Sequence, residues 1–532
     1  MYRFPDRIAV SVRHEHSVER FTYRQLDDRS CRAASLLAAL GLGPGDRCAL
    51  LAENSAGWVA VYLGVLRLGA VAVPFDTAYT PSQVAELVRD SGAGVLVTSR
   101  RSERAAHDAV EGACCRLALV DEAIGAEPGT IPPCAALPDD PAAILYTSGT
   151  TADPKGVVLT HANLLAEKDA AFQVVPVTEE DSILGVLPLF HALAQMANLL
   201  LPLSLGAHVV FLETLSTREL VRALDEERIS IVVCVPQFFY LIHQRVTAEV
   251  ASGGVGARAA FRGLLRLNRA LRRAGVNAGP WLFRRVHRML GRRMRILMTG
   301  GSKFDEAVGR DLHDLGFTIL QAYGLTETSG AATVTRPGEP IHTVGTPLPG
   351  VEIRTLPAHD GRDGEVLVRG PVVMKGYWNR PDATAAVLRD GWLHTGDLGR
   401  LDDGGRLTIT GRSKDVIVLS SGKNIYPEEI EAHYRQSPFI QELCVLGVAA
   451  PGEPAAERLH AFVVPDGEVL RERKIVNTSE LIRFELEGLS VSLPSHKRVL
   501  GFDVTMEPLP RTTTGKLKRH EIRQRYGAGG AA

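Results

Sequence analysis

The sequence has no excess of positive or negative charge. Its 532 residues include 60 lysines and arginines against 61 aspartates and glutamates, for a net charge of −1. A nucleic-acid-binding domain usually carries a clear basic excess, so the overall charge gives that function no support. The apolar share of 45% and the charged share of 23% are those of a globular protein. They exclude disordered, collagen-like and coiled-coil classes.

Cysteine is scarce and irregularly spaced. The seven cysteines include one adjacent pair and no Cys-x-x-Cys motif. This pattern predicts neither a disulfide framework nor a zinc site. The first residues, MYRFPDRIAVSVRHEH, lack the apolar run of a signal peptide. We therefore expect a cytoplasmic protein in a reducing compartment.

Lysine is also scarce, because only 10 of the 60 basic residues are lysines. Arginine is the usual cation of this chain. A lysine inside a loop rich in glycine and threonine is then of interest as a compact charge for a phosphate or a carboxylate. Lys155 and Lys516 both lie in such loops.

Charge is absent from residues 182–212, a stretch longer than the 20 or so residues of a membrane span. Prolines and polar residues divide it into a strand at 182–187, a helix at 192–201 and a strand at 207–212. We interpret it as buried core. The alternative is a lipid-binding membrane protein built around this stretch, against which the phosphate-binding motifs below argue.

The pattern of helices and strands changes twice along the chain. Alternating helices and strands over the first 120 residues indicate a layered α/β domain with mostly parallel strands. Five prolines predict a loop at 121–141, and short strands with glycine-rich turns predict a β-rich subdomain at 333–409. We predict an α/β fold: a large N-terminal domain of layered α/β subdomains plus a β-rich subdomain, followed by a small mobile α+β C-terminal domain.

A basic segment interrupts the balanced charge. Residues 251–304 contain 12 arginines, one lysine and no acidic residue. Arginines recur every three or four residues with leucines between them, which predicts a basic amphipathic helix. These arginines are Arg258, Arg262, Arg266, Arg269 and Arg273. A solvated face and a peripheral membrane contact through 258–295 both fit this pattern, and we expect no nucleic acid here.

The strongest local motif is AAILYTSGTTADPKGVVLTHANL, at 142–164. An apolar strand runs into a loop of small and hydroxyl-bearing residues that ends in a lysine, and a second strand follows. Backbone N–H groups, hydroxyls and one compact cation are the groups that surround a polyphosphate, although the loop is not a Walker A motif. The loop residues are Thr147, Ser148, Gly149, Thr150, Thr151 and Lys155.

Six motifs together resemble those of the AMP-forming adenylating enzymes, which include acyl-CoA synthetases, luciferases and peptide-synthetase adenylation domains. In order along the chain they are TSGTTADPKG, PLFHA, YGLTET, WLHTGDLG, GRSKDVIVLSSGKNIYPEEIE and PRTTTGKLKR. The stretch 22–76 also looks like the N-terminal part of that family, so the resemblance covers nearly the whole chain. Its form is most similar to bacterial long-chain fatty acyl-CoA synthetases.

The resemblance implies how ATP and Mg²⁺ are bound. The 147–155 loop would hold the pyrophosphate end of ATP, and Tyr323 would stack on adenine beside Gly301 and Ser302. Asp397 and Arg412 would contact the ribose. Roles nearer the reaction would fall to four residues: Thr326 at the α-phosphate, Glu327 at Mg²⁺, Lys516 at the substrate carboxylate and α-phosphate, and His191 as a gate between the acyl and thiol channels.

The resemblance also implies two domains that move. An adenylate-forming domain would cover 1–411, and a mobile domain would cover 412–532, with a hinge at Lys414 and the catalytic lysine loop at 510–519. Rotation between the half-reactions would withdraw Lys516. Ser421, Gly422 and Lys423 would then line the channel of the thiol of coenzyme A.

The expected substrate is an apolar carboxylic acid, most simply a medium- or long-chain fatty acid. PLFHA lacks the aspartate with which amino-acid-activating members pair the substrate ammonium, and the segments expected to line the acyl pocket are apolar. The expected product is acyl-CoA. The alternatives are a fatty acyl-AMP ligase that passes the acyl group to the phosphopantetheine of a carrier protein, and a ligase for an aryl or other carboxylic acid.

Overall fold

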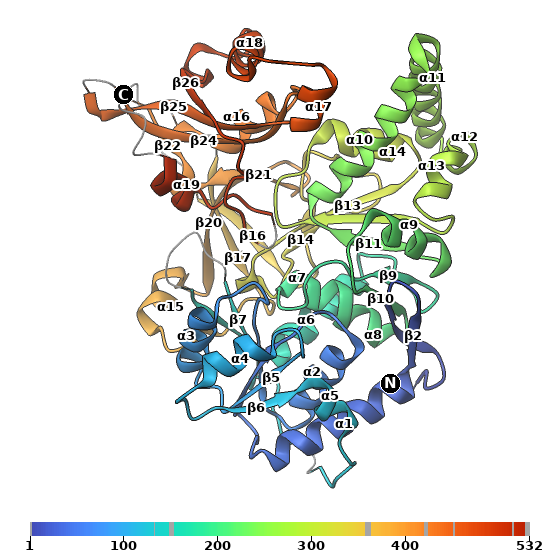
Figure 1. Cartoon of the computed structure of the whole chain (residues 1–532), viewed down its shortest axis with the longest axis vertical. Helices are drawn as coiled ribbons and strands as arrows, with labels where there is room; N and C mark the ends of the chain where they lie inside the picture. The colour runs from blue at the N-terminus through green and yellow to red at the C-terminus, as the bar shows by residue number, and fades with distance from the viewer. Residues whose placement is uncertain are drawn as a thin grey trace.

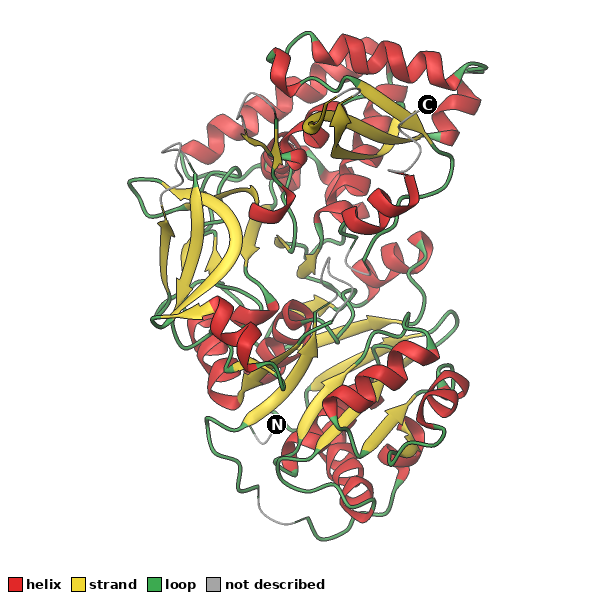
Figure 2. Cartoon of the chain, turned by 90° about the vertical axis from the view of Figure 1, so that its left-hand side faces the viewer, coloured by secondary structure: helices red, strands yellow, loops and turns green. Residues whose placement is uncertain are grey.

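The computed structural model describes residues 3–131, 134–147, 154–356, 363–419, 424–450, 453–512 and 515–526. It has the predicted mixed α/β fold, with a large N-terminal domain followed by a small C-terminal domain (Figure 1). The blue N-terminal and red C-terminal segments lie toward opposite ends of the molecule in Figure 1. Figure 2 shows the strands gathered in separate sheets with helices packed around them.

The first sheet has seven strands in the order β18-β8-β7-β4-β3-β5-β6. Their bounds are Arg47–Leu51 (β3), Val71–Pro74 (β4), Val95–Thr98 (β5), Arg116–Leu119 (β6), Pro141–Tyr146 (β7), Gly156–Thr160 (β8) and Gly376–Tyr377 (β18). In β3, Cys48 and Leu50 are buried in one apolar cluster, and Ala49 and Leu51 in another. Both faces of the sheet are therefore covered, which explains the continuous apolar runs of its parallel strands.

The second sheet has nine strands in the order β15-β14-β13-β12-β11-β9-β10-β1-β2. Their bounds are Ile8–Arg13 (β1), Val18–Thr22 (β2), Ser182–Leu184 (β9), His208–Leu212 (β10), Ile231–Cys234 (β11), Ile296–Gly300 (β12), Thr318–Tyr323 (β13), Thr333–Val334 (β14) and Thr346–Pro347 (β15). The strands from β13 through β1 pair in parallel. Their carboxyl ends consequently lie at one edge of the sheet.

Helices α1 (Tyr23–Ala39) and α2 (Ala56–Arg67) illustrate how the sequence specifies the first domain. Thr22 and Gln25 form a capping box that starts α1. Helix α2 is buried on nearly all sides, as its apolar composition requires. A β-carbon at Gly64 would come within 3.0 Å of α1 backbone atoms, so glycine is needed for the two helices to pack this closely.

The remaining helices of the N-terminal domain cover the sheets or lie at their edges. They are α3 (Pro81–Ser91), α4 (Glu103–Val110), α5 (Val120–Gly125), α6 (His161–Phe172), α7 (Ala192–Gln195), α8 (Leu201–Leu205), α9 (Thr217–Glu226), α10 (Pro236–Ser252), α11 (Gly254–Arg273), α12 (Gly279–Leu282), α13 (Arg284–Met289) and α14 (Glu306–Asp314). The prediction of a loop over 121–141 is wrong for the residues of α5. The first proline of that stretch comes only at Pro128, and the Glu122 carboxylate caps the start of the helix by accepting from the Leu119 N–H.

The uncharged stretch 182–212 forms two short strands and a helical segment, as predicted, with shifted ends. The helical segment runs from Ala192 through a π-helical turn at Met196–Leu200 to Leu205, farther than predicted. Pro202 is tolerated because it occupies the first turn of α8, where its missing N–H costs least. In the described ranges, no helix combines the length and the apolar character that crossing a membrane would require.

The β-rich subdomain is a five-stranded antiparallel sheet with helix α15 (Pro381–Val387). Its strands are Glu352–Leu356 (β16), Gly364–Arg369 (β17), Leu388–Arg389 (β19), Trp392–Leu401 (β20) and Leu407–Arg412 (β21). The C-terminal domain packs helices on a three-stranded sheet and a short hairpin. Its elements are Ile417–Val418 (β22), Asn424–Ile425 (β23), Pro427–Tyr434 (α16), Ile440–Ala450 (β24), Glu453–Pro465 (β25), Gly467–Glu472 (α17), Thr478–Ser490 (α18), Gly501–Val504 (β26) and Arg519–Tyr526 (α19).

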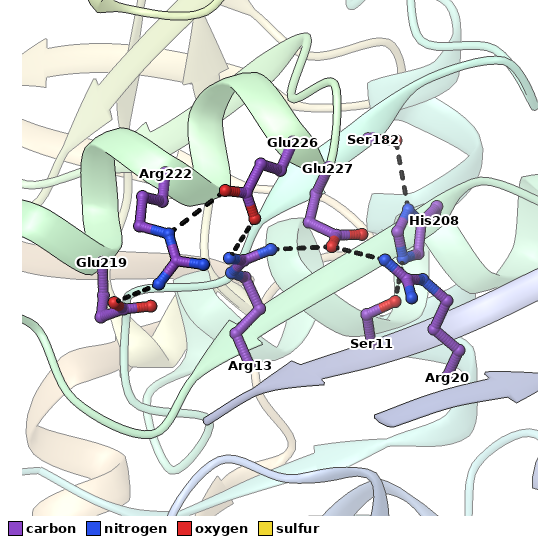
Figure 3. Close-up of polar contacts among 9 residues, drawn as sticks. All are labelled: Ser11, Arg13, Arg20, Ser182, His208, Glu219, Arg222, Glu226 and Glu227. Carbon is purple, nitrogen blue, oxygen red and sulfur yellow. Dashed lines mark hydrogen bonds and ion pairs between the residues drawn. The ribbon is translucent and has the colours of Figure 1, made fainter. Parts of the chain in front are cut away.

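A charged network fixes the N-terminal hairpin to helix α9 (Figure 3). Arg13 is 3% exposed and donates to Glu227 at 2.9 Å and to Glu226 at 2.6 Å. Arg20 donates to Glu227 at 2.8 Å. The hydrogen bond from Arg13 holds the pKa of Glu226 below its ordinary value, so this contribution to stability is present at neutral pH and is lost in acid, as the pH falls through the folded-state pKa.

We predict that Arg13→Ala lowers the free energy of unfolding by about 1.5–3 kcal/mol, because it removes the charge-assisted hydrogen bonds to Glu226 and Glu227, while Arg20 still pairs with Glu227. The control is Arg24→Ala, which removes an ion pair with Asp6 whose side chains are 67% and 82% exposed. That control should change stability by less than about 1 kcal/mol. Urea unfolding followed by circular dichroism measures both, and equal losses would contradict a special role for the buried network.

Candidate active site

The predicted site residues of the large domain gather at the carboxyl edge of the nine-stranded sheet. Tyr323 is the last residue of β13, Gly301 and Ser302 follow β12, and His191 lies on the connection that follows β9. In open α/β sheets ligands bind at this edge. Gly301 has a φ of 83° and is exposed, so its backbone is open to a ligand.

Asp397 is a buried carboxylate of the site, and both of its oxygens have polar partners. It is 3% exposed, and its Oδ2 accepts a hydrogen bond from the Tyr323 hydroxyl at 2.8 Å. Its Oδ1 lies 2.9 Å from Nε of Arg412, the residue opposite it on the neighbouring strand β21. A buried carboxylate needs such partners, and each oxygen still keeps a free lone pair. Asp397 can therefore accept further hydrogen bonds from a bound hydroxyl.

The turn before Asp397 is held by Glu365, a residue that the sequence analysis missed. Glu365 accepts a hydrogen bond from the Gly396 N–H at 3.1 Å and contacts His394 Nδ1 at 3.0 Å. Thr395 donates to the Val366 carbonyl at 2.7 Å and accepts from the Asp397 N–H at 3.0 Å. Glu365 lies in β17, and its partner Gly396 lies 31 positions later in the chain, so no local spacing revealed the contact.

Glu327 and Lys155 both contact Tyr377, one at its hydroxyl and the other over its ring. Thr326 and Glu327 begin a single 3₁₀ turn, Thr326–Thr328. The Glu327 carboxylate accepts from the Tyr377 hydroxyl at 2.8 Å, and Lys155 Nζ lies 5.1 Å from the centre of the same ring. The Thr147 N–H donates to the Lys155 carbonyl at 3.1 Å, which closes the base of the predicted phosphate loop.

Some predicted site residues lie outside the described residues. In the phosphate loop these are Ser148, Gly149, Thr150 and Thr151, and in the predicted thiol channel they are Ser421, Gly422 and Lys423. Their predicted roles stay predictions.

Lys516 comes to the site from the C-terminal domain. Its loop is a tight turn in which the Lys516 N–H donates to Thr512 Oγ1 at 3.1 Å and the Thr512 N–H donates to the Lys516 carbonyl at 2.8 Å. Lys516 is exposed to solvent. The surrounding protein nevertheless desolvates its amine in part and lowers the pKa of that amine to about 8. Arg412 lowers this pKa further, and Asp397 and Glu327 oppose the effect.

The position of the Lys516 loop depends on Arg519, which the sequence analysis also left without a role. Arg519 donates to Glu431 of helix α16 at 2.6 Å and to the Val445 carbonyl of β24 at 3.0 Å. Burial opposes the charge of Arg519, but Glu431 outweighs it and raises the pKa well above its ordinary value. This buried pair attaches the loop and helix α19 to the body of the C-terminal domain.

Lys414 lies in the 3₁₀ turn Ser413–Asp415, directly after β21 and before the first strand of the C-terminal domain. Burial and the neighbouring Arg412 lower the pKa of its amine, and Asp397 and Glu327 act in the opposite direction. Lys414 therefore lies within the same group of charges as Lys516.

His191 is a neutral imidazole at pH 7. Burial, with a smaller contribution from the positive charge of Lys516, lowers its pKa to about 4. The Asn54 side chain holds the preceding segment by donating to the Leu187 carbonyl at 2.8 Å and accepting from the Leu189 N–H at 2.9 Å. The Phe190 ring centre lies 4.4 Å from that of His191. The histidine thus directly follows a segment that Asn54 holds by two hydrogen bonds.

Half-buried apolar side chains follow β9 and β11, parallel neighbours whose carboxyl ends lie at the same edge of the sheet as His191. Leu193 in α7, Val235 after β11 and Phe238 at the start of α10 are half-buried hydrophobic residues. The segments 182–212 and 231–242 contain no charged residue. A second charged group on a substrate would find no ion-pair partner in either segment. Gln195 and Asn198, both buried, have amide nitrogens without hydrogen-bond partners in the described structure.

The residues present fit Mg²⁺ that arrives with a nucleotide. Across the part of the chain that the structure describes, no three histidine, cysteine or acidic side chains gather to hold a metal ion. Mg²⁺ in nucleotide sites commonly takes one or two carboxylates together with phosphate oxygens and water. Glu327 offers one such carboxylate beside the phosphate loop.

Known proteins match this chain over almost its full length. The sequence pattern described as "AMP-binding enzyme" matches residues 1–378, and "AMP-binding enzyme C-terminal domain" matches 414–528. Long-chain-fatty-acid–CoA ligase FadD13 of Mycobacterium tuberculosis is 30% identical, covering 98% of this chain and 97% of that protein. Feruloyl-CoA synthase of an Amycolatopsis species is also 30% identical, over 98% of this chain and 96% of its own length.

A solved structure is similar to this chain over nearly the same length. The o-succinylbenzoate CoA synthetase MenE of Bacillus subtilis, in complex with its acyl-adenylate intermediate, is 28% identical, with a TM-score of 0.78. The similarity covers 98% of this chain and 96% of that one.

Proposed function

This chain belongs to the AMP-binding enzyme family, and from that premise we propose that it converts a medium- or long-chain fatty acid to its acyl-CoA. It is an AMP-forming acid–CoA ligase that uses ATP and coenzyme A. What the proposal adds is the kind of acid and the residue roles. The observation that carries it is the pairing of Asp397 with Arg412 and Tyr323, with Lys516 and Glu327 in electrostatic reach, in a large domain whose segments 182–212 and 231–242 carry no charge.

In the first half-reaction the substrate carboxylate attacks the α-phosphate of ATP, and pyrophosphate leaves. Two anions must approach each other, so the protein has to supply positive charge rather than a nucleophile. We assign this role to Lys516, whose ammonium is mostly protonated at pH 7 because its pKa is about 8. Mg²⁺, when bound with the phosphates through Glu327, would add Lewis-acid stabilisation of their charge.

Nucleotide binding would divide among the other residues. Asp397 has lone pairs left for the ribose hydroxyls, and Arg412 is already oriented toward the same place by its contact with Asp397. Tyr323 offers its ring to adenine next to Gly301 and Ser302. Thr326 would contact the α-phosphate, and Lys155 with the loop 147–151 would hold the pyrophosphate end.

In the second half-reaction the thiol of coenzyme A attacks the acyl-adenylate carbonyl and AMP leaves. We propose that the boundary between a domain at 1–411 and a mobile domain at 412–532 allows the C-terminal domain to turn about Lys414. Lys516, on the loop 510–519, would then withdraw, and Ser421, Gly422 and Lys423 would line the path of the thiol. His191, neutral and held by its neighbours, would separate the acyl and thiol channels.

Support for a fatty acid comes from the apolar residues that follow β9 and β11, at the same edge of the sheet as His191. Burial of each CH₂ contributes about 0.8 kcal/mol, so half-buried Leu193, Val235 and Phe238 favour an alkyl tail. A second candidate is an aryl acid that bears hydroxyl or ether groups. The amides of Gln195 and Asn198 favour this candidate, because their unpartnered atoms could bind such groups. Transfer to a carrier protein instead of coenzyme A is the third alternative.

The test is pyrophosphate exchange into ATP across a panel of fatty, hydroxyaryl and amino acids, with coenzyme A and a carrier protein offered in parallel. We expect exchange with fatty acids and thioester formation with coenzyme A. Exchange should fall as the pH rises above 8, because Lys516 then loses its proton. Lys516→Ala should lose about 10²–10³-fold in exchange while it still transfers a supplied acyl-adenylate to coenzyme A.

Two results would contradict these assignments. Exchange with hydroxyaryl acids alone would overturn the fatty-acid proposal. Equal losses of both half-reactions in a folded Lys516→Ala protein would overturn the role of that lysine.

We further propose that the basic helix α11 and the turn after it touch the surface of an anionic membrane, from which a fatty acid would be drawn. Arg258, Arg262 and Arg266 are exposed on α11, which lies at the upper right of Figure 1. Apolar residues lie exposed among the arginines, with Trp281 at 79% and Val255 at 77%. Basic residues with exposed aromatic and aliphatic side chains are typical of peripheral membrane contacts.

Two arginines of this segment have structural partners and do not belong to that surface. Arg269 donates through Nε to the buried Asp314 at 2.8 Å, and Arg272 donates to the His313 carbonyl at 3.1 Å. The prediction of a single basic face over Arg258–Arg273 is therefore too broad. Variants that test the membrane proposal have to leave these two residues in place.

We predict that reversing Arg258, Arg262 and Arg266 to Glu weakens binding to vesicles of anionic lipid by at least about 100-fold. Each basic residue near such a surface contributes about 1 kcal/mol. Co-sedimentation with vesicles at low salt measures the binding of the variant and of the wild type. The matched control reverses Arg89, Arg101 and Arg104, which are exposed at α3 and α4 toward the other end of the molecule.

Activity on a short, soluble acid should stay unchanged in both triple variants. A wild-type protein that never sediments with anionic vesicles would contradict the proposal and leave α11 as a solvated face. Capture of an acidic carrier protein instead, lost in the α11 variant, would assign the same surface to a protein partner.

A further inference from the structure

Tyr377 is fixed beside the phosphate loop by its backbone. Strand β18 pairs antiparallel with β8, so that Tyr377 lies opposite Val157. The Lys375 N–H donates to the Val158 carbonyl at 3.0 Å, and the Trp378 N–H donates to the Gly156 carbonyl at 2.7 Å. Because β8 begins directly after Lys155, this pairing holds the tyrosine at a set position relative to that lysine.

The same segment also holds Glu327 from its backbone. The Met374 N–H donates to the Glu327 carbonyl at 2.8 Å, and the Tyr377 hydroxyl donates to the Glu327 carboxylate at 2.8 Å. Glu327 is thus bound twice by residues 374–377. Neither Tyr377 nor Met374 was singled out by the sequence, because their partner lies about 50 positions earlier in the chain.

The ring of Tyr377 lies next to a cation as well as a carboxylate. Lys155 Nζ is 5.1 Å from the ring centre, within the range at which an ammonium is attracted to an aromatic face. Among the contacts of the described residues, Lys155 has this ring contact and Glu327 has the Tyr377 hydroxyl, and the two charges form no ion pair with each other. An ion pair between the two would neutralise the charges that both must offer to a nucleotide.

We propose that Tyr377 is a positioning residue that separates Lys155 from Glu327 and orients each toward the phosphates. Its hydroxyl aims the carboxylate, and its ring holds the ammonium. This inference rests on the proposed function, since the phosphates belong to the ATP bound at this site. Tyr377 itself need not touch the substrate.

The test compares ATP binding by calorimetry in Mg²⁺ and in a chelator, so that no turnover is needed. Tyr377→Phe keeps the ring and removes the hydroxyl. It should weaken ATP binding about 10-fold in Mg²⁺ and leave binding in the chelator unchanged, because a hydrogen bond to a charged group corresponds to roughly tenfold or more in affinity. In a Glu327→Gln background Tyr377→Phe should then have no further effect.

Tyr377→Leu removes the aromatic ring and tests whether that ring keeps Lys155 and Glu327 apart. Lys155 and Glu327 should then pair, so ATP binding should weaken about 3- to 10-fold even in the chelator. Adding Glu327→Gln to Tyr377→Leu should restore part of that loss, because it frees the lysine. The matched control is Tyr23→Phe, which removes a buried hydroxyl that donates to the Ala207 carbonyl at 2.6 Å. It should lower the unfolding temperature without changing ATP affinity.

Wild-type affinity in Tyr377→Phe under both conditions would overturn the role of the hydroxyl. Failure of Glu327→Gln to recover binding in Tyr377→Leu would overturn the separating role of the ring. These results differ from a failure of the proposed function, in which the wild-type protein itself would bind no ATP and show no pyrophosphate exchange with any acid.

Discussion

The hydrogen-bonded carboxylate of Asp397 connects the parts from which the site is built. Tyr323 belongs to the nine-stranded sheet, Asp397 and Arg412 to the β-rich subdomain, and the chain enters the C-terminal domain immediately after Arg412. A carboxylate that is 3% exposed is stable only with such partners. The same contacts that make its burial possible therefore fix Tyr323 and Arg412 relative to each other, directly before the chain enters the C-terminal domain.

Three cations interact with one another around Asp397. Lys516, Lys414 and Arg412 all interact with Asp397 and Glu327, and Asp415 is a third carboxylate of the group. Desolvation by the surrounding protein lowers the pKa of Lys516, and the positive charges of Arg412 and Lys414 lower it further. An anion would relieve the repulsion among the cations, which makes the group complementary to a nucleotide phosphate. Lys516 belongs to the C-terminal domain. Binding of such an anion would therefore also favour the arrangement of the two domains in which adenylation takes place.

Much of this could be predicted from the sequence. Alternating apolar patterns gave the layered α/β domain, and the six ordered motifs gave Tyr323, Asp397, Arg412 and Lys516 as neighbours. What the sequence could not give are contacts between distant segments, such as Glu365 with Gly396, Tyr377 with Glu327 and Arg519 with Glu431. Periodicity likewise assigned Arg269 to a solvent face, although its partner Asp314 lies 45 positions later.

The measurement that tests this account most directly is the affinity of the Asp397→Asn variant for ATP and for 2′-deoxy-ATP, determined by calorimetry. Asparagine keeps the shape of the side chain and a carbonyl oxygen for Tyr323, but it removes the charge that pairs with Arg412 and that we propose accepts hydrogen bonds from the ribose. The account predicts that the wild type prefers ATP and that the variant binds both nucleotides equally and at least about tenfold more weakly. Unchanged affinity and preference in the folded variant would contradict it.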